Sequence, residues 1–269
     1  TLVKVASRGD SAPEMSANPR RLALRGLARH ARSPGVSGQA ILRPLLDGPD
    51  ARAMDRRDKA LCTELFYGVL RWRLRLDTVL ERHARKGVPS DPELANLLRM
   101  GLYQLIVTDR IPPRAAVDTT VTLARKARGQ KVAGFVNGLL RGVLRDGAEP
   151  QSLAERWGHP EWLVTRLQAQ LGDGLEARLE ANMTSPPITL RMKSGAKGPN
   201  GALPTSVPGV VDASSVATAA VRKGTRKGWW LPQDPASARV VALLDPQPGE
   251  AVLELCGGRG VKTSQIAEC

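Results

Sequence analysis

Leucines at helical spacing are the feature that most constrains the fold of this chain. Between Asp91 and Thr108 they recur every three or four residues, which places them on one face of a helix. Asp91 can cap this helix and Pro92 suits its first turn. Gly101 lies on the same face and would let a neighbouring helix approach closely. The leucines concerned are Leu94, Leu97, Leu98, Leu102 and Leu105.

Similar apolar stripes predict an all-α domain over residues 19–146. One long amphipathic helix is expected over residues 58–82, with basic side chains on its flank. Residues 114–127 and 132–145 predict two further helices, separated at Gly129, a residue type that commonly ends helices. No alternating pattern of the kind found in strands occurs in this region, so we expect a helical bundle.

The helical region carries almost all of the excess positive charge. The chain has 40 Lys and Arg against 26 Asp and Glu, a net charge of +14, and residues 20–146 alone have 25 against 12, a net charge of +13. Such a localised excess favours a nucleic-acid partner, because each neutralised phosphate releases a counterion. The alternative is a solvated basic surface that binds nothing. We predict RNA contacts at Arg56, Lys59, Arg71, Arg73 and Arg75.

Cysteine and histidine usage excludes several classes of protein. Three cysteines and three histidines are scattered without metal-like spacing, so we expect neither a disulfide framework nor a bound metal. No stretch approaches the ~18 apolar residues of a membrane span. We therefore expect a cytoplasmic monomer without membrane contact, in which residues 1–18 form a disordered lead-in.

Residues 147–232 predict a connecting region with a small α+β module. Helices are expected over 161–171 and 174–182, and β-prone segments over 188–192 and 209–211. Residues 223–230 interleave three basic side chains with Trp229 and Trp230, a pattern that could stack bases and hold phosphates. The alternative is that both tryptophans pack between domains.

Residues 233–269 predict the start of an α/β domain. After a helix over 235–244, the apolar run 251–256 suits a buried parallel strand, and a glycine-rich bend then leads into a helix over 262–267. Strand, glycine loop and helix form the nucleotide-binding opening of a Rossmann-like fold. Val261 stands where a Walker loop needs Gly, and Thr263 where a dinucleotide loop needs Gly. The spacing of Glu254, Gly258 and Gly260 instead resembles the first motif of S-adenosylmethionine-dependent methyltransferases.

Four ordered blocks of sequence, residues 56–73, 97–105, 111–118 and 134–141, resemble a known family. They resemble the NusB-like RNA-binding domain, in the version found at the N-terminus of the RsmB (Sun, Fmu) family of rRNA cytosine-C5 methyltransferases. The glycine loop is similar to that family's Cys-Ala-Ala-Pro-Gly-Gly-Lys-Thr signature, with matches at Cys256, Gly260, Lys262 and Thr263.

The resemblance implies a multidomain protein: a NusB-like helical domain (19–146), a linker module (147–232) and the beginning of a Rossmann-like methyltransferase domain (233–269). It also implies methyl transfer from S-adenosylmethionine to C5 of a cytosine in small-subunit ribosomal RNA. The family's catalytic cysteines are expected beyond residue 269, so this chain alone should be inactive. Two alternatives stay open, a non-catalytic NusB-type antitermination protein and a degenerate pseudo-enzyme. The implied cofactor residues are Cys256, Gly257, Gly258, Arg259, Gly260, Val261 and Lys262.

Overall fold

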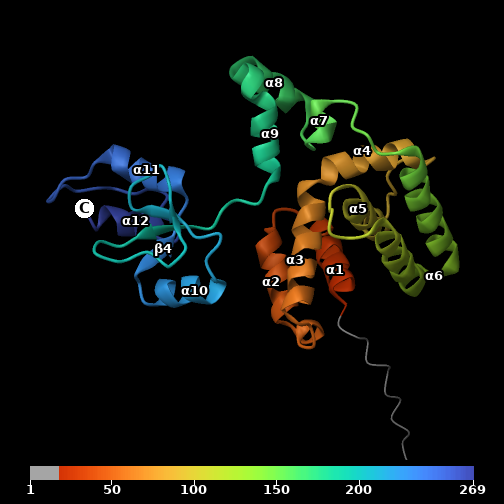
Figure 1. Cartoon of the computed structure of the whole chain (residues 1–269), viewed down its shortest axis with the longest axis horizontal. Helices are drawn as coiled ribbons and strands as arrows, with labels where there is room; N and C mark the ends of the chain where they lie inside the picture. The colour runs from red at the N-terminus through yellow and green to blue at the C-terminus, as the bar shows by residue number, and fades with distance from the viewer. Residues whose placement is uncertain (1–17) are drawn as a thin grey trace, which may run out of the picture. The chain divides into compact units, whose positions relative to one another are not determined.

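The computed structural model describes residues 18–269, which form two compact units (Figure 1). The first unit ends at Thr184 and the second spans Ser185–Cys269. The expected lead-in lies, up to residue 17, outside the described residues. The first unit contains α1 (Pro19–Ala31), α2 (Gly38–Asp47), η1 (Pro49–Ala51), α3 (Arg56–Arg71), α4 (Arg73–His83), α5 (Pro92–Ile106), α6 (Pro113–Asp146), α7 (Leu153–Arg156), α8 (Glu161–Leu171), η2 (Gly172–Gly174) and α9 (Leu175–Met183).

Helix α5 is the centre of the first unit. Every residue from Ala95 to Gln104 is buried, and the helix packs against α1, α3, α4 and α6. Its polar side chains are therefore paired inside the unit. The guanidinium of Arg99 donates from Nε and Nη2 to the two carboxylate oxygens of Asp77, at 2.6 and 3.0 Å. The amide oxygen of Gln104 accepts a 2.7 Å hydrogen bond from Arg20.

The helices that the leucine spacing predicts are present. Asp91 caps α5 by accepting a hydrogen bond from the N–H of Glu93, and Gly101 lies against Thr120 and Leu140 of α6. The predicted separation at Gly129 is also confirmed, because this glycine has φ 80° and ψ −179° and interrupts the helical backbone of α6. Close helix packing at Gly101 thus follows from the absence of a side chain.

The expectation of one continuous helix over residues 58–82 is wrong. The helical path stops at Trp72 (φ −91°, ψ 8°) and restarts as α4. The Trp72 ring lies 6.5 Å from the ring of Trp157, and the guanidinium of Arg75 sits 5.6 Å from the Trp72 centroid. The break therefore lets Trp72 pack on a segment from much later in the chain, a contact that local periodicity cannot reveal.

Helix α4 holds the segment that follows α6. Arg82 donates to the carbonyl of Glu149 at 3.0 Å and forms an ion pair with Glu155, and His83 contacts the carbonyl of Gly147 at 3.0 Å. The predicted helices over 161–171 and 174–182 follow as α8 and α9. They share a small separate core with α7, made of Ala154, Val164, Leu175 and Leu179.

The second unit is a four-stranded antiparallel sheet with helices. The strand order is β2-β3-β1-β4, and the register pairs Leu190 with Val211 and Arg191 with Leu231. Because side chains alternate along a strand, Leu190 joins the apolar cluster with Trp230, whereas Arg191 reaches α12 on the other face. The elements are β1 (Thr189–Met192), β2 (Leu203–Pro204), β3 (Val210–Asp212), α10 (Thr218–Arg226), β4 (Trp230–Pro232), α11 (Pro235–Leu244) and α12 (Val261–Ile266).

The prediction of a buried strand over residues 251–256 is wrong for the described chain. This segment has no strand pairing, and Leu253 and Leu255 are 83% and 86% exposed. The outer side of α11 is also apolar and exposed, with Leu243 at 79%. A parallel strand needs neighbouring strands for its backbone hydrogen bonds, and the described residues supply none beside this segment. The helices on either side of it, α11 and α12, do form as predicted.

Gly68 of α3 supports a prediction about packing. A Cβ at this position would lie 2.1 Å from Cζ of Tyr103, whose hydroxyl is held by a hydrogen bond to Glu64. We expect Gly68→Ala to lower the free energy of unfolding by roughly 1–3 kcal/mol, because the ring cannot move without breaking that bond. Urea unfolding followed by circular dichroism measures the change.

Gly134→Ala in α6 is the matched control. A Cβ there meets no atom within 4 Å, so the better helix propensity of alanine should stabilise the unit by up to about 1 kcal/mol. Equal effects of the two substitutions would contradict the tight contact between Gly68 and Tyr103.

Candidate functional site

The glycine loop forms a tight bend that leads into α12. Gly258 and Gly260 both have positive φ, 55° and 72°, a conformation that favours glycine. The N–H of Gly260 donates to the carbonyl of Gly257 at 2.8 Å, and the N–H of Ser264 donates to the carbonyl of Gly260 at 2.8 Å. The loop is thus built from its own backbone, with no side chain over Gly258 within 4 Å of where a Cβ would stand.

Glu254 lies beside this bend with an unused acceptor. Its Oε2 accepts a hydrogen bond from the hydroxyl of Thr263. Its Oε1 is buried and has no hydrogen-bond partner among the described residues. A buried carboxylate oxygen without a donor is costly, so this atom is available to a ligand that carries a hydroxyl or an amino group.

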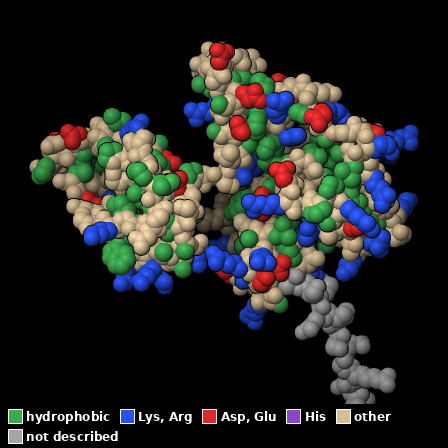
Figure 2. All heavy atoms as spheres, viewed as in Figure 1, with side chains coloured by type: hydrophobic (Ala, Val, Ile, Leu, Met, Phe, Trp, Pro, Cys, Tyr) green, Lys and Arg blue, Asp and Glu red, His purple; other side chains and the backbone are tan. Residues whose placement is uncertain are grey.

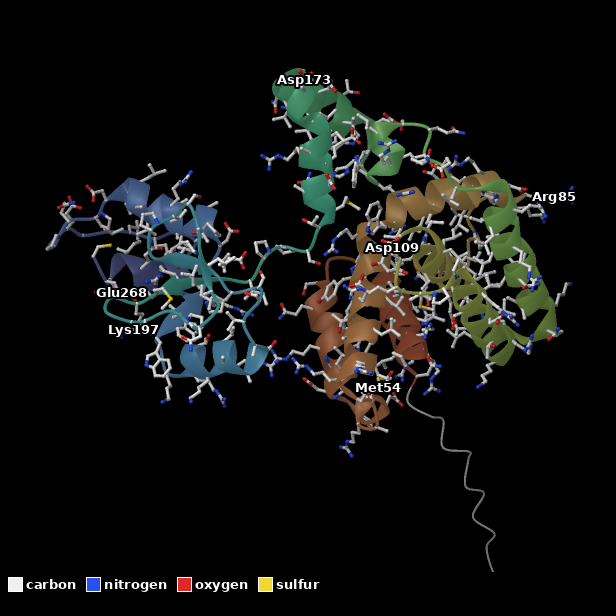
Figure 3. The ribbon with its side chains drawn as sticks, viewed as in Figure 1. Met54, Arg85, Asp109, Asp173, Lys197 and Glu268 are labelled. Carbon is white, nitrogen blue, oxygen red and sulfur yellow. The ribbon has the colours of Figure 1, made fainter. Side chains whose placement is uncertain are left out.

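A buried arginine anchors the helix after the loop. Arg191 of β1 is 5% exposed, and it donates to Gln233 at 2.7 Å and to Ser264 of α12 at 2.9 Å. It also forms an ion pair with Glu268, which Figure 3 labels. These contacts cross from the sheet to α12, so they fix where the glycine loop ends.

A chain of amide groups reinforces the same anchor. Gln233 follows β4, and its side chain donates to the side-chain oxygen of Gln265 at 2.7 Å. Gln265 in turn donates to the carbonyl of Ala238 in α11 at 3.1 Å, and the hydroxyl of Thr189 donates to the carbonyl of Gln233 at 2.8 Å. Strands β1 and β4 and helices α11 and α12 are therefore joined by one polar network, which local sequence patterns did not reveal.

The seven predicted cofactor residues lie together because they are contiguous. Cys256 and Arg259 are exposed, and Val261 and Lys262 begin α12 half-buried. Cys62 is different from the other two cysteines. It is fully buried in α3, and burial raises the pKa of its thiol to about 11. Such a thiol is almost entirely protonated at neutral pH and unsuited to act as a nucleophile.

The five predicted RNA contacts fall at the two ends of α3. Arg56 and Lys59 lie in its first turn, and Arg71, Arg73 and Arg75 lie at its far end and in α4, roughly 22 Å further along. Arg73 is exposed but forms a 3.5 Å ion pair with Asp77. Arg75 is half-buried, and one of its Nη groups donates to the carbonyl of Arg156 at 3.2 Å. Burial lowers the pKa of Arg75. Its hydrogen bond to Arg156 connects α4 to α7.

Helix α1 carries a basic stripe that was not predicted from the sequence. Arg21, Arg25, Arg29 and Arg32 recur at helical spacing and, together with Lys126 of α6, line a hollow of about 670 Å³. Arg25 pairs with Asp50 across the edge of this hollow. Arg29, Arg32 and Lys126 are exposed and have no carboxylate partner in residues 18–269. Figure 2 shows Lys and Arg side chains over much of the visible face of this unit. The spacing of these arginines by four and three residues was the sequence signal that could have predicted a basic helix face.

Comparisons with known proteins agree with this architecture. Residues 17–145 match the NusB family, and residues 159–196 match the ferredoxin-like domain of RsmF/B-like methyltransferases. The crystal structure of PH0851 superimposes with a TM-score of 0.66 at 18% identity, covering 94% of this chain and 60% of that one. That likeness shows a shared fold. Residues 17–145 of the first unit are therefore similar to the NusB family, and residues 159–196 are similar to part of a methyltransferase-type ferredoxin-like domain.

Curated relatives make the relation more specific. The chain is 33% identical to ribosomal RNA small subunit methyltransferase B of Cronobacter sakazakii, of Escherichia fergusonii and of Citrobacter koseri. Each match covers 91% of this chain and 61% of the relative. The chain is thus a relative of the ribosomal RNA small subunit methyltransferase B proteins and spans about three fifths of their length. No helix within residues 18–269 is long and apolar enough to cross a membrane.

The Arg191 network leads to a stability prediction. Arg191→Ala should lower the free energy of unfolding of the second unit by about 3 kcal/mol, because it leaves Glu268 and Gln233 without their buried partner. Urea unfolding followed by tryptophan fluorescence measures this change, since Trp229 and Trp230 both lie in that unit.

Arg239→Ala is the matched control for this measurement. Arg239 lies exposed on α11 of the same unit and has no ion pair in the described part of the chain. We expect it to change stability by less than about 0.5 kcal/mol. A loss of similar size in both variants would show that Arg191 does not anchor α12.

Proposed function

We propose that this chain is the RNA-binding and cofactor-loop part of a small-subunit ribosomal RNA methyltransferase. In this proposal a methyl group passes from S-adenosylmethionine to C5 of a cytosine. The observation that carries it is the relation to ribosomal RNA small subunit methyltransferase B over 91% of the chain. The glycine loop adds support against a purely NusB-type antitermination role, since such a protein would have no use for a cofactor loop after its helical domain.

The residues around the glycine loop fit S-adenosylmethionine. The positive φ angles of Gly258 and Gly260 leave backbone accessible to a ligand, and the buried Oε1 of Glu254 lacks a donor. Hydroxyl or amino groups of the cofactor could supply that donor. Bound there, S-adenosylmethionine would provide an electrophilic methyl group. The role of the protein at this loop is to hold and orient the cofactor through Cys256–Lys262.

Methylation at C5 of cytosine also requires a nucleophile. C5 is a weak nucleophile until a thiolate adds to C6, a form of covalent catalysis. Cys62 cannot serve because it is buried and its pKa is raised. Cys256 belongs to the glycine loop, and Cys269 lies exposed just after α12. We therefore propose that the catalytic thiolate does not come from residues 18–269.

The proposed RNA surface combines the predicted and the newly observed basic residues. Arg56, Lys59 and Arg73 are retained from the predicted set, and the α1 stripe adds Arg29 and Arg32. Their positive charge fits phosphate contacts, which give affinity without reading sequence. Arg71 and Arg75 stay predictions, and Arg75 contributes fewer free donors because one of its Nη groups is bonded to the carbonyl of Arg156.

Charge reversal tests the RNA surface. Arg56→Glu, Lys59→Glu and Arg73→Glu combined should weaken binding to small-subunit rRNA fragments about tenfold or more, as should Arg29→Glu, Arg32→Glu and Lys126→Glu combined. Each lost phosphate contact should also reduce the slope of log affinity against log salt by roughly one. Fluorescence anisotropy at several salt concentrations measures both quantities.

A control with the same change in net charge separates local from global effects. Arg166→Glu, Arg178→Glu and Arg239→Glu combined alters three exposed arginines outside the proposed surface. We expect a smaller loss of affinity for this variant. If all three variants weakened binding equally, net charge rather than a defined surface would explain the binding.

The cofactor loop is tested by Gly260→Val in the complete gene product. Valine at φ 72° is strained, and its methyl groups would lie where the loop backbone is proposed to contact the cofactor. Calorimetry should therefore show loss of S-adenosylmethionine binding. Gly201→Val is the control, because Gly201 also has positive φ (85°) and open space around it but lies away from the loop in sequence. Unchanged cofactor affinity in Gly260→Val would show that the loop is misplaced.

The same proposal predicts that residues 1–269 alone transfer no methyl groups. A tritium-transfer assay on under-methylated small-subunit rRNA checks this expectation. Robust formation of 5-methylcytosine by this chain would contradict the assignment of the three cysteines.

A further inference from the structure

The two adjacent tryptophans of the second unit have opposite environments. Trp230 is 4% exposed, its ring lies against Gly224 of α10, and its indole N–H donates to the carbonyl of Val221 at 3.0 Å. Trp229 is 43% exposed, with its ring 5.7 Å from that of Trp230 in an edge-to-face arrangement. Packing explains Trp230 and leaves the exposure of Trp229 without a structural reason.

The backbone holds Trp229 in one place. Its N–H donates to the carbonyl of Gly224 at 3.0 Å, and its own carbonyl accepts a 3.0 Å hydrogen bond from the N–H of Lys193. Trp229 immediately precedes β4, so the sheet fixes it on the following side as well. With its backbone fixed and its ring packed edge-to-face on the buried ring of Trp230, the exposed indole is a preorganised flat surface, which lowers the entropy cost of binding against it.

A positively charged hollow opens beside the indole. It has a volume of about 490 Å³ and is lined by Lys193, Lys197, Trp229 and the backbone around Gly195 and Gly228. No carboxylate lines it. This volume lies within the usual range of about 300–1,000 Å³ for small-molecule sites and suits one nucleoside. Lys197 is labelled in Figure 3.

Further cations surround the hollow. The ammonium group of Lys227 lies 4.8 Å from the centroid of the Trp229 ring. Helix α10 adds Arg222, Lys223 and Arg226, which are exposed and have no carboxylate partner within residues 18–269. Figure 2 shows Lys and Arg side chains gathered on the edge of the second unit that carries α10. The only carboxylate near the lining lysines is that of Glu268, 3.7 Å from Lys193 among the described contacts.

We propose that this hollow binds one nucleotide of a single-stranded RNA segment, with its base stacked on Trp229. Lys193, Lys197 and Lys227 would hold the phosphates on either side of that base, and the cations of α10 would continue the backbone path. An exposed indole among cations, in a hollow that no carboxylate lines, fits an unpaired base and its phosphates better than a peptide. The inference rests on the proposed RNA-binding function and assigns it a second site, outside the NusB-family domain.

The stacking contact is tested with two labelled probes of equal charge. One is a fluorescein-labelled decamer of oligouridylate, and the other is the same ribose-phosphate backbone without bases. The wild-type chain should bind the first more tightly, and Trp229→Ala should weaken that binding by about 5-fold to about 100-fold. Trp229→Phe should retain most of the affinity, because phenylalanine also stacks. In Trp229→Ala the two probes should bind nearly alike.

Trp162→Ala is the matched control. Trp162 lies on α8 and is 67% exposed, so this substitution removes an exposed indole outside the proposed site. It should leave the preference for bases unchanged. Lys193→Gln combined with Lys197→Gln should weaken both probes and lower the salt dependence, since these lysines are proposed to contact phosphates.

Two outcomes would overturn the inference. The first is equal affinity of the wild-type chain for the two probes, and the second is an unchanged preference for bases in Trp229→Ala. Either result leaves the proposed function intact as long as small-subunit rRNA fragments still bind and respond to the two triple charge reversals described above. Failure of every variant and the wild-type chain to bind any RNA would instead remove the proposed function itself.

Discussion

Burial of helix α5 on every side is the constraint on which the first unit depends. Because no face of this helix meets water, its polar side chains need partners from other helices, and those partners fix where the helices lie. Arg99 donates hydrogen bonds to Asp77 of α4, and Gln104 accepts one from Arg20 of α1. Gly101 allows α6 to approach to side-chain contact. The positions of α1, α3 and α6, and therefore of the basic residues on their outer faces, follow from this one central helix.

The second unit uses a different device for the same purpose. Its sheet is small: β1 has four residues, β3 and β4 have three each, and β2 has two. The polar network around Arg191 therefore contributes much of what joins sheet and helices. The buried charge of Arg191 is matched by Glu268 and by the side chains of Gln233 and Ser264, so it sets the position of α12 without an unpaired group. The glycine loop owes its fixed end to this arrangement.

Local features of the sequence predicted most of the helical unit, and non-local contacts explain the differences. The leucines of α5, the cap at Asp91 and the break at Gly129 act within a few residues, so periodicity and capping rules found them. The break at Trp72 depends on Trp157, far along the chain. Strands β2 and β4 are too short to show alternation, and the contacts of Arg191 with α12 join residues more than 70 positions apart. The cofactor-loop residues and the RNA contacts remain predictions. The α1 stripe was not predicted because its arginines were counted only within the net charge of residues 20–146.

The exposed leucines around the glycine loop have a consequence for biosynthesis. Helical units rich in local contacts fold quickly, so the first unit can form as soon as it leaves the ribosome. Leu243, Leu253 and Leu255 are each largely exposed, and the described residues provide no strand to cover the segment 251–256. An apolar surface of this kind invites association between nascent copies. Residues 243–255 would therefore be a natural point of chaperone dependence during synthesis.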